Sequence, residues 1–308
     1  MVYTVTLNPA LDRTLFVDTL ALGESSRIRR EARYAGGKGV DVSRALVEMD
    51  VPTVALGLVG GFDGKEFEGR LLNEGVACDF TRISGEIRTN IVIHGDEGLE
   101  TALLARGPEV QPVELMNFMD HLEGVNGSGF LVVSGSLPPG LTPAVYGRIL
   151  SIGRDKGLTT VLDASGEALR TGIRARPDVI KPNRSELAEL AGTEPAGPPG
   201  ILRFCRTIQE EVATILVSLG ADGILLVQSG RGLLARPPQV EVKSTVGAGD
   251  CAVAGFIAGL ARDESPADCL RRAVAAGTAA TLTPGTGICC REDIARLLPD
   301  ITLEEVTA

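Results

Sequence analysis

The sequence predicts an α/β fold in three layers: a mostly parallel central sheet with helices on both faces, and a small β-sheet standing off the main body. Short apolar runs rich in Val, Ile and Leu alternate with longer helical patterns, which is typical of parallel sheets that are buried on both faces. Four half-polar segments interrupt this alternation. The length of 308 residues allows one large α/β unit or about two domains.

The alternation of apolar runs and helical patterns predicts the positions of the strands and helices. Buried strands are expected at Thr53–Val59, Gly129–Val133, Leu158–Leu162, Val179–Ile180 and Ala213–Val217, with helices at Val40–Met49, Gly64–Glu74, Thr142–Arg154 and Arg184–Ala191. From Asp250 onward the pattern is nearly all helical, at Asp250–Arg262, Pro266–Leu282 and Arg291–Leu298. Because the alternation resumes after the Pro- and Gly-rich stretch Gly192–Gly200, that stretch is interpreted as a surface loop. We therefore expect one domain over residues 1–308.

Four segments have strand-like composition with polar alternation. They are Arg13–Asp18, Arg27–Tyr34, Thr89–His94 and Thr101–Ala105. Half-polar strands within a parallel α/β pattern indicate a separate antiparallel sheet. Such a sheet, drawn from about residues 13–34 and 88–105, would serve as a lid over a cleft or as a dimer surface.

The charge balance limits the partners. The chain has 40 acidic and 30 basic residues, a formal net charge of −10, which opposes binding to nucleic acid and to anionic lipid. No apolar run approaches the ~18 residues of a membrane span. The first residues, Met1–Leu7, lack the pattern of a signal peptide. We expect a cytoplasmic protein with neither nucleic acid nor membrane as partner.

Cysteine and histidine offer little for catalysis or metal binding. None of the six cysteines forms a Cys-x-x-Cys pair, so neither a zinc ribbon nor a thioredoxin-type site is supported. Cys251 and Cys269 lie in apolar helical pattern and are expected in the core. With only two histidines, His94 and His121, the chemistry must depend on carboxylates, backbone amides and a few cations.

The stretch Ser244–Asp250 is the most informative one. Its small residues form a tight turn before a helix, an arrangement that presents backbone N–H groups to an anion such as phosphate. A carboxylate beside bound phosphate would be repelled by it, but Asp250 could accept a proton from a hydroxyl attacking that phosphate. The alternative is that Asp250 only caps the helix.

A second glycine-rich stretch, Gly36–Gly39, precedes an expected helix. Lys38 is one of only five lysines in the chain, and its setting predicts a second anion cradle. The stretch is not a Walker A loop, because Gly39 follows the lysine where Ser or Thr is required. The glycines of Gly57–Gly64 lack the Gly-x-Gly-x-x-Gly spacing, which argues against dinucleotide binding.

A third stretch, Lys181–Glu186, follows the strand Val179–Ile180. It lies where the carboxyl ends of parallel strands place ligand groups. Asn183 and Glu186 are three residues apart at a helix start, so both could face one hydrated cation. The same pair is also the pattern of a capping box, and on the residues alone the capping box is the favoured interpretation.

Six motifs in order along the whole chain resemble those of the ribokinase-like (PfkB) family of carbohydrate kinases. They are Thr6–Asp12, Ala35–Gly39, Ser134–Gly140, Lys181–Glu186, Val217–Gly223 and Ser244–Asp250. The likeness is greatest to the sugar-phosphate branch, which contains the 1-phosphofructokinases, tagatose-6-phosphate kinases and minor 6-phosphofructokinases. The resemblance implies a ribokinase-like sandwich with a β lid, and phosphorylation of a sugar hydroxyl that depends on ATP and Mg²⁺. A monovalent cation is a further candidate cofactor.

The resemblance also implies roles for particular residues. Asp250 would be the general base, with an anion hole made by the amides of Gly247, Ala248 and Gly249. The sugar phosphate would be held by Asp12, Gly37, Lys38, Gly39, Asp41, Arg88, Asn90 and Ser136. The nucleotide would meet Lys181, Asn183, Ser218, Gly220, Ser244, Val246 and Gly277, and Asn183 and Glu186 would organise Mg²⁺ through water. A lid with an apolar face (Leu15, Val17, Ile91 and Ile93) predicts a homodimer.

The chain departs from the branch at Asp41 and Ser26, where Asn is usual. Asp41 adds negative charge near an anionic substrate, which should weaken phosphate binding unless Lys38 or an arginine pairs with it. The last lid strand has no arginine before Arg106, unlike the minor 6-phosphofructokinases, and this favours fructose 1-phosphate as substrate. Against this, Ala275–Leu282 resembles the minor 6-phosphofructokinase type. A 6-phosphofructokinase or tagatose-6-phosphate kinase, a kinase of neutral sugars or nucleosides, and a non-catalytic sugar-phosphate sensor remain as alternatives.

Overall fold

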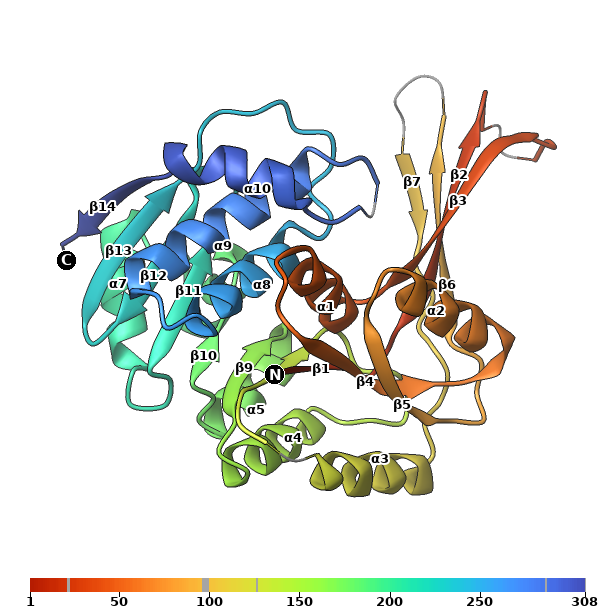
Figure 1. Ribbon diagram of the computed structural model, residues 1–308, viewed down its shortest axis with the longest axis horizontal. Coiled ribbons are helices and arrows are strands. Elements are labelled where there is room, and N and C mark those ends of the chain that lie inside the picture. Colours follow the sequence, from red (N-terminus) through yellow and green to blue (C-terminus); the bar gives the residue numbers. More distant parts are fainter. Residues whose placement is uncertain (21–22, 96–99, 126, 286, 308) are drawn as a thin grey trace.

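A ten-stranded sheet runs through the centre of the protein in this computed structural model (Figure 1). Its order is β14-β13-β12-β11-β10-β9-β8-β1-β4-β5. The strands from β11 to β5 pair in parallel, and those from β14 to β11 pair antiparallel. The bounds are β1 (Val2–Thr6), β4 (Thr53–Val59), β5 (Ala77–Arg82), β8 (Phe130–Ser134), β9 (Thr159–Asp163), β10 (Val179–Ile180), β11 (Thr214–Ser218), β12 (Ile224–Gln228), β13 (Arg231–Arg236) and β14 (Thr302–Val306).

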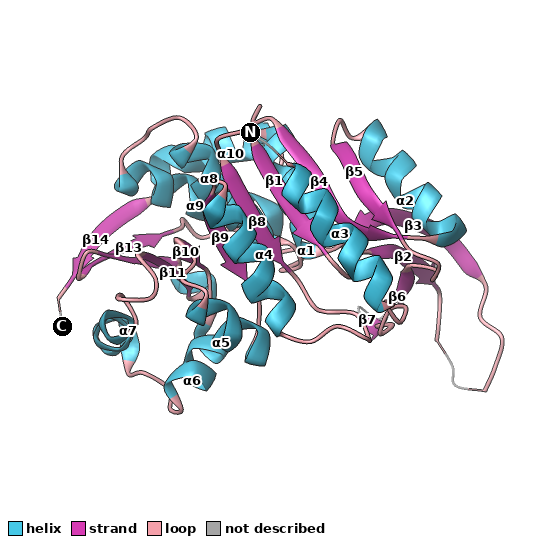
Figure 2. Ribbon diagram, turned by 90° about the horizontal axis from the view of Figure 1, so that it is seen from below, coloured by secondary structure: helices cyan, strands magenta, loops and turns pink. Residues whose placement is uncertain are grey.

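Helices cover both faces of this sheet (Figure 2). One face carries α1 (Lys38–Glu48), α2 (Gly61–Asn73), α8 (Ala248–Leu260), α9 (Pro266–Thr281) and α10 (Arg291–Leu297). The other carries α3 (Pro112–Gly124), α4 (Ala144–Asp155), α5 (Gly166–Arg174), α6 (Arg184–Ala191) and α7 (Gly197–Thr207). Successive side chains of a strand point to opposite faces, so Leu131 of β8 packs in one core cluster and Val132 in the other. The predicted three-layer α/β fold is confirmed.

The structure describes residues 1–20, 23–95, 100–125, 127–285 and 287–307. Residues 21–22 and 96–99 of the predicted lid therefore lie outside the described residues. Within the described ranges, no helix combines the length and the apolar character that crossing a membrane requires.

Helix α1 packs directly on the central strand β1. A Cβ atom at Gly39 would lie 2.5 Å from Thr6 Oγ1, so a larger residue would push the helix away from the sheet. Buried hydroxyls satisfy one another at this contact, with Ser43 Oγ 2.7 Å from Thr4 Oγ1 and 2.7 Å from Thr53 Oγ1. The close packing places the first turn of α1, and with it Lys38, at the carboxyl end of β1.

A separate four-stranded sheet contains the segments predicted for the lid and is named the lid here (Figure 1). Its order is β3 (Ile28–Gly36), β2 (Ala10–Val17), β6 (Arg88–His94) and β7 (Glu100–Leu103). The expectation of a wholly antiparallel sheet was wrong, because the central pair β2–β6 is parallel. Both strands leave the main body from the same end, where Ala10 pairs with Arg88, so they run in one direction.

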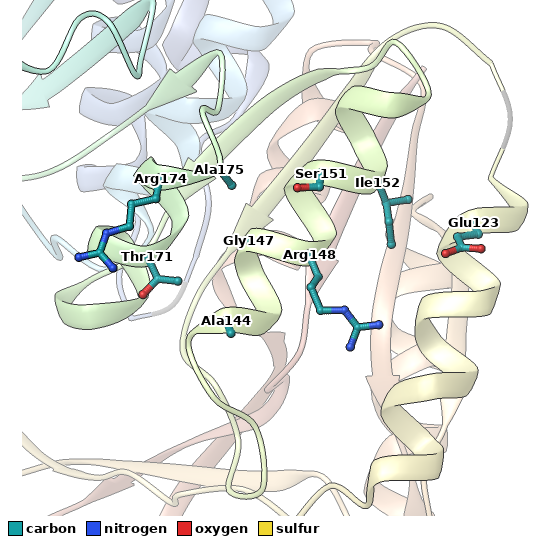
Figure 3. Close-up of a pocket in the computed structure, with 9 residues that line it drawn as sticks. All are labelled: Glu123, Ala144, Gly147, Arg148, Ser151, Ile152, Thr171, Arg174 and Ala175. Atoms are coloured by element: carbon teal, nitrogen blue, oxygen red, sulfur yellow. The ribbon is translucent and has the colours of Figure 1, made fainter.

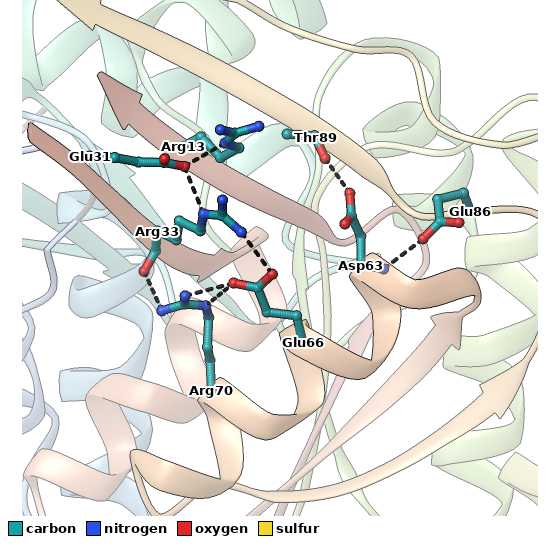
Figure 4. A network of polar contacts seen from close by, with 8 residues as sticks. All are labelled: Arg13, Glu31, Arg33, Asp63, Glu66, Arg70, Glu86 and Thr89. Atoms are coloured by element: carbon teal, nitrogen blue, oxygen red, sulfur yellow. Dashed lines mark hydrogen bonds and ion pairs between the residues drawn. The ribbon is translucent and has the colours of Figure 1, made fainter. Parts of the chain in front are cut away.

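Charged side chains join the base of the lid to α2 (Figure 4). Arg33 Nη1 lies 3.0 Å from Glu66 Oε2, and Arg70 Nη1 donates to the Arg33 carbonyl oxygen at 2.9 Å. Hydrogen bonds from Arg13 and Arg33 lower the pKa of Glu31 to about 2. The lid is thus tied to the main body through α2 as well as through its own strands.

Two segments in the second half of the chain differ from expectation, although the three helices expected from Asp250 onward are present. Gly192–Gly200 is not all loop, because Gly197 begins α7 and both prolines that follow it lie in the first helical turn. Proline is tolerated there, since the first N–H groups of a helix have no intrahelical partner. The chain after Asp250 is not all helical either, because Thr302–Val306 forms β14 and pairs antiparallel with β13.

Candidate active site

Polar residues gather where the parallel strands end at one edge of the sheet. Asn8 follows β1, Ser136 follows β8, Asp163 ends β9 and Lys181 follows β10. These four strands are neighbours in the order β10-β9-β8-β1, so their carboxyl ends meet. This edge is where open α/β sheets bind their ligands.

A buried carboxylate joins two lysines at this edge. The side chain of Asp163 is 0% exposed, and its Oδ1 lies 3.3 Å from Lys38 Nζ and 3.4 Å from Lys181 Nζ. Burial raises the pKa of Asp163, but the Lys181 and Lys38 ammonium groups outweigh that effect and lower it. Burial lowers the pKa of Lys38, yet Asp163, Asp250 and Glu186 raise it overall. The cluster therefore holds an ionised carboxylate between two ammonium groups.

Sequence reasoning did not single out Asp163. The available signal was an acidic residue directly after the predicted buried strand Leu158–Leu162, at the edge where ligand groups gather. Nothing in the local sequence shows that Lys38, 125 residues earlier, would reach it.

Asp250 lies in the first turn of α8 and is 7% exposed. Its Oδ1 is buried and has no hydrogen-bond partner in the described part of the chain. The N-cap of α8 is Gly247, so the interpretation of Asp250 as the helix cap was wrong. Burial raises the pKa of Asp250 well above its ordinary value, and so do the negative charges of Asp163 and Asp41, while Lys38 and Lys181 lower it.

The loop before α8 turns through a left-handed glycine, and its Ala248 N–H donates to the Thr245 carbonyl oxygen at 3.4 Å. Gly247 has φ 76°, a left-handed conformation that favours glycine. A Cβ atom at Gly249 would lie 3.3 Å from Lys181 Nζ, so this loop and Lys181 are neighbours. Ser244 Oγ donates to the Gly285 carbonyl oxygen at 2.8 Å and fixes the start of the loop.

Val246 and Gly277 were also predicted on the nucleotide side, near this loop. Val246 is 49% exposed. Gly277 of α9 allows close helix packing, because its Cβ atom would lie 3.1 Å from the Ala248 carbonyl oxygen.

A pocket of about 200 Å³ opens beside Lys38. It is lined by Thr6, Asn8, Gly37, Lys38, Arg88, Gly135, Ser136 and Ser165. Asn8 Nδ2 donates to Ser136 Oγ at 3.2 Å, while Asn8 Oδ1 and Arg88 Nε are buried without a partner in the described chain. Polar atoms that lack a protein partner beside a pocket can bond to a polar ligand that enters it. Asn8 and Ser165 were not predicted as site residues; Asn8 lies within the Thr6–Asp12 motif.

The base of the lid supplies a second set of predicted residues. Asn90 Nδ2 donates to Asp12 Oδ1 at 2.8 Å, and Asn90 Oδ1 accepts from the Ala105 N–H at 3.1 Å. Arg88 Nη1 donates to the Ala105 carbonyl oxygen at 3.1 Å. Burial raises the pKa of Asp12, although Asn90, Arg88 and Arg44 lower it. These bonds place Asp12 and Arg88 where the lid meets the main body.

Asp41 does not line the pocket, and its charge is paired. Arg44 Nη1 lies 2.9 Å from Asp41 Oδ1, and Arg44 Nε lies 2.5 Å from Glu74 Oε2. Burial raises the pKa of Asp41 to about 6, although Arg44 lowers it. The condition stated above, that an arginine must pair with Asp41, is met by Arg44. Ser26, the other departure, donates its hydroxyl to the Thr19 carbonyl oxygen at 2.8 Å.

Asn183 and Glu186 form the capping box of α6. Asn183 Oδ1 accepts from the Glu186 N–H, and Glu186 Oε2 accepts from the Asn183 N–H, both at 2.8 Å. Nearby, Ser218 forms a bridge with Asn183, and Gly220 begins a short 3₁₀ turn. The box leaves Glu186 Oε1 for a water molecule of a hydrated cation, a donor that suits Mg²⁺. No group of three or more His, Cys, Asp or Glu in the described chain could hold a metal ion.

A second hollow, about 500 Å³, lies on the outer surface of α4 and α5 (Figure 3). Its lining includes Ala144, Gly147 and Ser151 of α4 and Thr171 and Arg174 of α5. It contains none of the predicted site residues. The smaller pocket beside Lys38 is the better candidate because its buried polar atoms lack partners.

The chain is similar to known proteins over nearly its whole length. Residues 5–293 match the model of the pfkB family of carbohydrate kinases. The chain is 32% identical over 302 residues to the 1-phosphofructokinase of Bacillus subtilis, with 98% of each chain covered. It is 33% identical over 309 residues to that of Escherichia coli K12, again with 98% of each covered.

Solved structures of related proteins superpose on nearly the whole chain. Phosphofructokinase-2 from Escherichia coli, in complex with potassium, superposes with a TM-score of 0.92 at 29% identity, covering 97% of this chain and 98% of that one. A ribokinase from Arabidopsis thaliana, complexed with ribose and ATP, has a TM-score of 0.77 at 20% identity, covering 96% and 98%. The second likeness concerns the fold alone.

Proposed function

Because the chain belongs to the pfkB family of carbohydrate kinases, we propose that it transfers the γ-phosphoryl group of ATP to a hydroxyl of fructose 1-phosphate, forming fructose 1,6-bisphosphate and ADP. One observation carries the proposal. A pocket with unpaired Arg88 Nε and Asn8 Oδ1 opens beside Lys38, and Lys38 is an electrostatic neighbour of Asp250. A cation-lined pocket next to a general base suits an anionic sugar.

Asp250 acts as the general base in this proposal. Its buried Oδ1 has no partner in the described chain and is free to accept the proton of the attacking hydroxyl. The raised pKa makes the carboxylate a stronger base than an exposed aspartate, while Lys38 and Lys181 limit that rise. Brønsted behaviour favours a base whose pKa lies nearer to the working pH.

The amides of Gly247, Ala248 and Gly249 bind the transferring phosphoryl group. Charge on its oxygen atoms is stabilised by N–H groups fixed before the reaction begins, and by the positive end of α8. Lys181 lies beside this loop and contributes a full positive charge on the nucleotide side. Ser218, Gly220, Ser244, Val246 and Gly277 complete the nucleotide side of the site.

Lys38, Arg88, Ser136 and Asn8 hold the phosphate that the sugar already carries. Arginine and lysine make short, charge-assisted hydrogen bonds to phosphate oxygen atoms. At the base of the lid, Asp12 accepts hydrogen bonds from sugar hydroxyls and the Asn90 amide N–H donates to a sugar oxygen. Gly37 and Gly39 shape the loop, and Asp41 stabilises it through Arg44.

Magnesium bound with the nucleotide would neutralise phosphate charge. Asn183 and Glu186 would hold it through water, since the capping box leaves one carboxylate oxygen of Glu186 unused. A monovalent cation is a further proposed cofactor, supported by the potassium complex of Escherichia coli phosphofructokinase-2. We place the enzyme in the cytoplasm, where ATP is supplied.

A second candidate is a 6-phosphofructokinase. A solved complex of Escherichia coli phosphofructokinase-2 with fructose-6-phosphate superposes with a TM-score of 0.90 at 28% identity. The curated 1-phosphofructokinases are 32–33% identical over nearly the whole chain, and β7 (Glu100–Leu103) carries no arginine. Both facts favour fructose 1-phosphate.

We propose a homodimer through the lid. Leu15 pairs directly with Ile93 across β2 and β6, so Leu15, Val17, Ile91 and Ile93 share one face of the lid sheet. Val17 is already buried, so a second lid covering this face would remove mainly the other three apolar side chains from water. Light scattering should give twice the mass of the chain, and a clean monomer would contradict the dimer.

The substrate is tested by measuring ADP release from the purified protein with MgATP. The panel is fructose 1-phosphate, fructose 6-phosphate, tagatose 6-phosphate, ribose and adenosine. We expect the highest kcat/KM with fructose 1-phosphate. Preference for another phosphorylated ketose would change the substrate but keep the roles of Lys38 and Arg88. Activity on ribose or adenosine alone would contradict the sugar-phosphate pocket, and no activity would favour a sensor.

A further inference from the structure

The two lysines of the site come from opposite sides of it. Lys38 begins α1 and lines the sugar pocket, whereas Lys181 follows β10 and lies beside Gly249 in the loop before α8. Their ammonium groups nevertheless approach the same atom, Asp163 Oδ1, at 3.3 and 3.4 Å. Two like charges this close repel each other, most strongly where water is scarce, as at Lys181, whose side chain is 5% exposed. The carboxylate between them is the group that offsets this repulsion.

Asp163 itself is held rigidly. It is the last residue of β9, and β9 is paired in parallel with β8 on one side and β10 on the other. Its backbone carbonyl oxygen accepts from the Gly135 N–H at 3.1 Å. The side chain is fully buried, and its Oδ2 has no partner in the described part of the chain. The position of the Asp163 carboxylate is therefore set by β9, and the flexible lysine side chains adjust to it.

We infer that Asp163 is a positioning residue that connects the sugar-side Lys38 to the nucleotide-side Lys181, so that both ammonium groups point to the place where the phosphoryl group is transferred. This inference rests on the proposed function. Asp163 need not touch either substrate. Without its charge, the two lysines would move apart, and each would meet its substrate in a less productive position.

The test is a double-mutant cycle measured as kcat/KM with MgATP and fructose 1-phosphate. The variants are Asp163→Asn, which keeps the shape and removes the charge, Lys38→Met, and the double variant. We expect Asp163→Asn alone to lower kcat/KM by about 10²-fold, the scale of a misplaced reacting group. In the Lys38→Met background, Asp163→Asn should lower kcat/KM by less than about 3-fold, because the effects of residues that act through each other are not additive. Equal factors in both backgrounds would overturn the inference.

A pH profile separates positioning from a packing defect. Asp250 is surrounded by Asp163, Asp41, Lys38 and Lys181, and removal of the Asp163 charge removes a repulsive neighbour of its carboxylate. The acidic limb of kcat/KM should therefore move to lower pH in Asp163→Asn. An unmoved limb would mean that the charge of Asp163 does not act on the site, and this would overturn the inference.

A matched control is available at the opposite edge of the sheet. Asp178 precedes β10 and accepts from the Thr160 N–H at 2.7 Å and from Thr160 Oγ1 at 2.8 Å. Asp178→Asn removes a hydrogen-bonded carboxylate without touching either lysine. Its kcat/KM and its acidic limb should equal those of the wild type.

The cycle remains decisive if Asp163→Asn fails to fold. Lys38→Met, Lys181→Met and their double variant leave Asp163 in place, and two lysines connected through one carboxylate should show non-additive losses. Additive losses would overturn the inference. If the wild-type protein releases no ADP with any sugar phosphate, the proposed function is overturned. If the wild type is active but the losses are additive, only the inference about Asp163 is overturned.

Discussion

Arg44 and Asp41 form an ion pair one turn apart on α1, with Arg44 Nη1 2.9 Å from Asp41 Oδ1 and side chains that are 5% and 16% exposed. The same guanidinium reaches Glu74 at the end of α2 and the Ala35 carbonyl oxygen of β3. One arginine thus joins the helix that carries Lys38 to α2 and to the lid. Arg44 offsets the negative charge of Asp41, although that charge still contributes to the raised pKa of Asp250.

Loss of Arg44 should destabilise the protein strongly. The Arg44→Met substitution leaves Asp41 buried and uncompensated, and breaking a buried pair in this way costs about 3–5 kcal/mol. The free energy of urea unfolding measures the loss. Arg291→Met is the matched control, because Arg291 and Asp50 are 54% and 71% exposed and an exposed pair contributes less than about 1 kcal/mol. Equal losses in the two variants would contradict the role of the buried pair.

Asp250→Asn should keep substrate binding and lose turnover. The amide cannot accept the proton of the sugar hydroxyl, so kcat should fall by at least about 10²-fold, while calorimetry shows ATP and fructose 1-phosphate still bound. Asp268 is the control, because it also lies three residues after the N-cap of its helix, α9. Asp268→Asn should leave kcat unchanged. An Asp250→Asn variant with near wild-type activity would remove the general base from the mechanism.

The pH dependence follows from the raised pKa of Asp250. The base works only when ionised, so kcat/KM should fall with decreasing pH at a value above the ordinary pKa of 3.8. Stability should change in the opposite sense. A carboxyl whose pKa is raised by folding favours the protonated form, so the wild type loses stability relative to Asp250→Asn as pH rises from 3.8 through the raised pKa.

The contribution of Asp268 to stability should change with pH in the opposite direction to that of Asp250. Hydrogen bonds from Ser265 and Arg271 lower its pKa, so its contribution to stability is present above the ordinary pKa and is lost as pH falls. Urea unfolding is measured across a pH series. Toward neutral pH, the free energy of unfolding relative to the wild type should rise for Asp250→Asn and fall for Asp268→Asn. The same sign for both variants would contradict the burial of Asp250 as the cause.

Gly247→Ala should damage catalysis beyond its effect on stability. At φ 76° a Cβ atom costs about 1–2 kcal/mol, and the relaxation of the strain moves the amides of the anion hole. Gly192→Ala is the control, because Gly192 has φ 72° at the end of α6 with nothing within 4 Å of its Cβ position. Both variants should lose similar stability in urea unfolding, and only Gly247→Ala should lose kcat, by at least about 10-fold. Equal kcat in both would exclude the loop from catalysis.

Local patterns predicted much of the site because they depend on residues close in the chain. The capping box of Asn183 and Glu186 needs only a three-residue spacing, and it is present. The pairing of Asp41 with Arg44 was foreseeable in the same way, at i,i+3 on one helix. The contribution of Glu74 was not, because it comes from another helix.

Parts that depend on strand order escaped prediction. The sequence shows that β9 ends in Asp163, but only the order β10-β9-β8-β1 brings Lys38 and Lys181 to that carboxylate. The central lid pair β2–β6 was expected to be antiparallel and is parallel. Its direction is set by where both strands leave the main body, and no pattern within either strand records that.

The sequence alone determined the alternation of strands and helices, the loop before α8 and the residue types available for catalysis, because each depends on periodicity, glycine content or composition over a short stretch. Only the tertiary structure decided which charges meet. Asp163 joins Lys38 to Lys181, and Arg44 offsets the charge of Asp41. Interactions between charges depend on distance and burial, and both are set by packing between segments far apart in the chain.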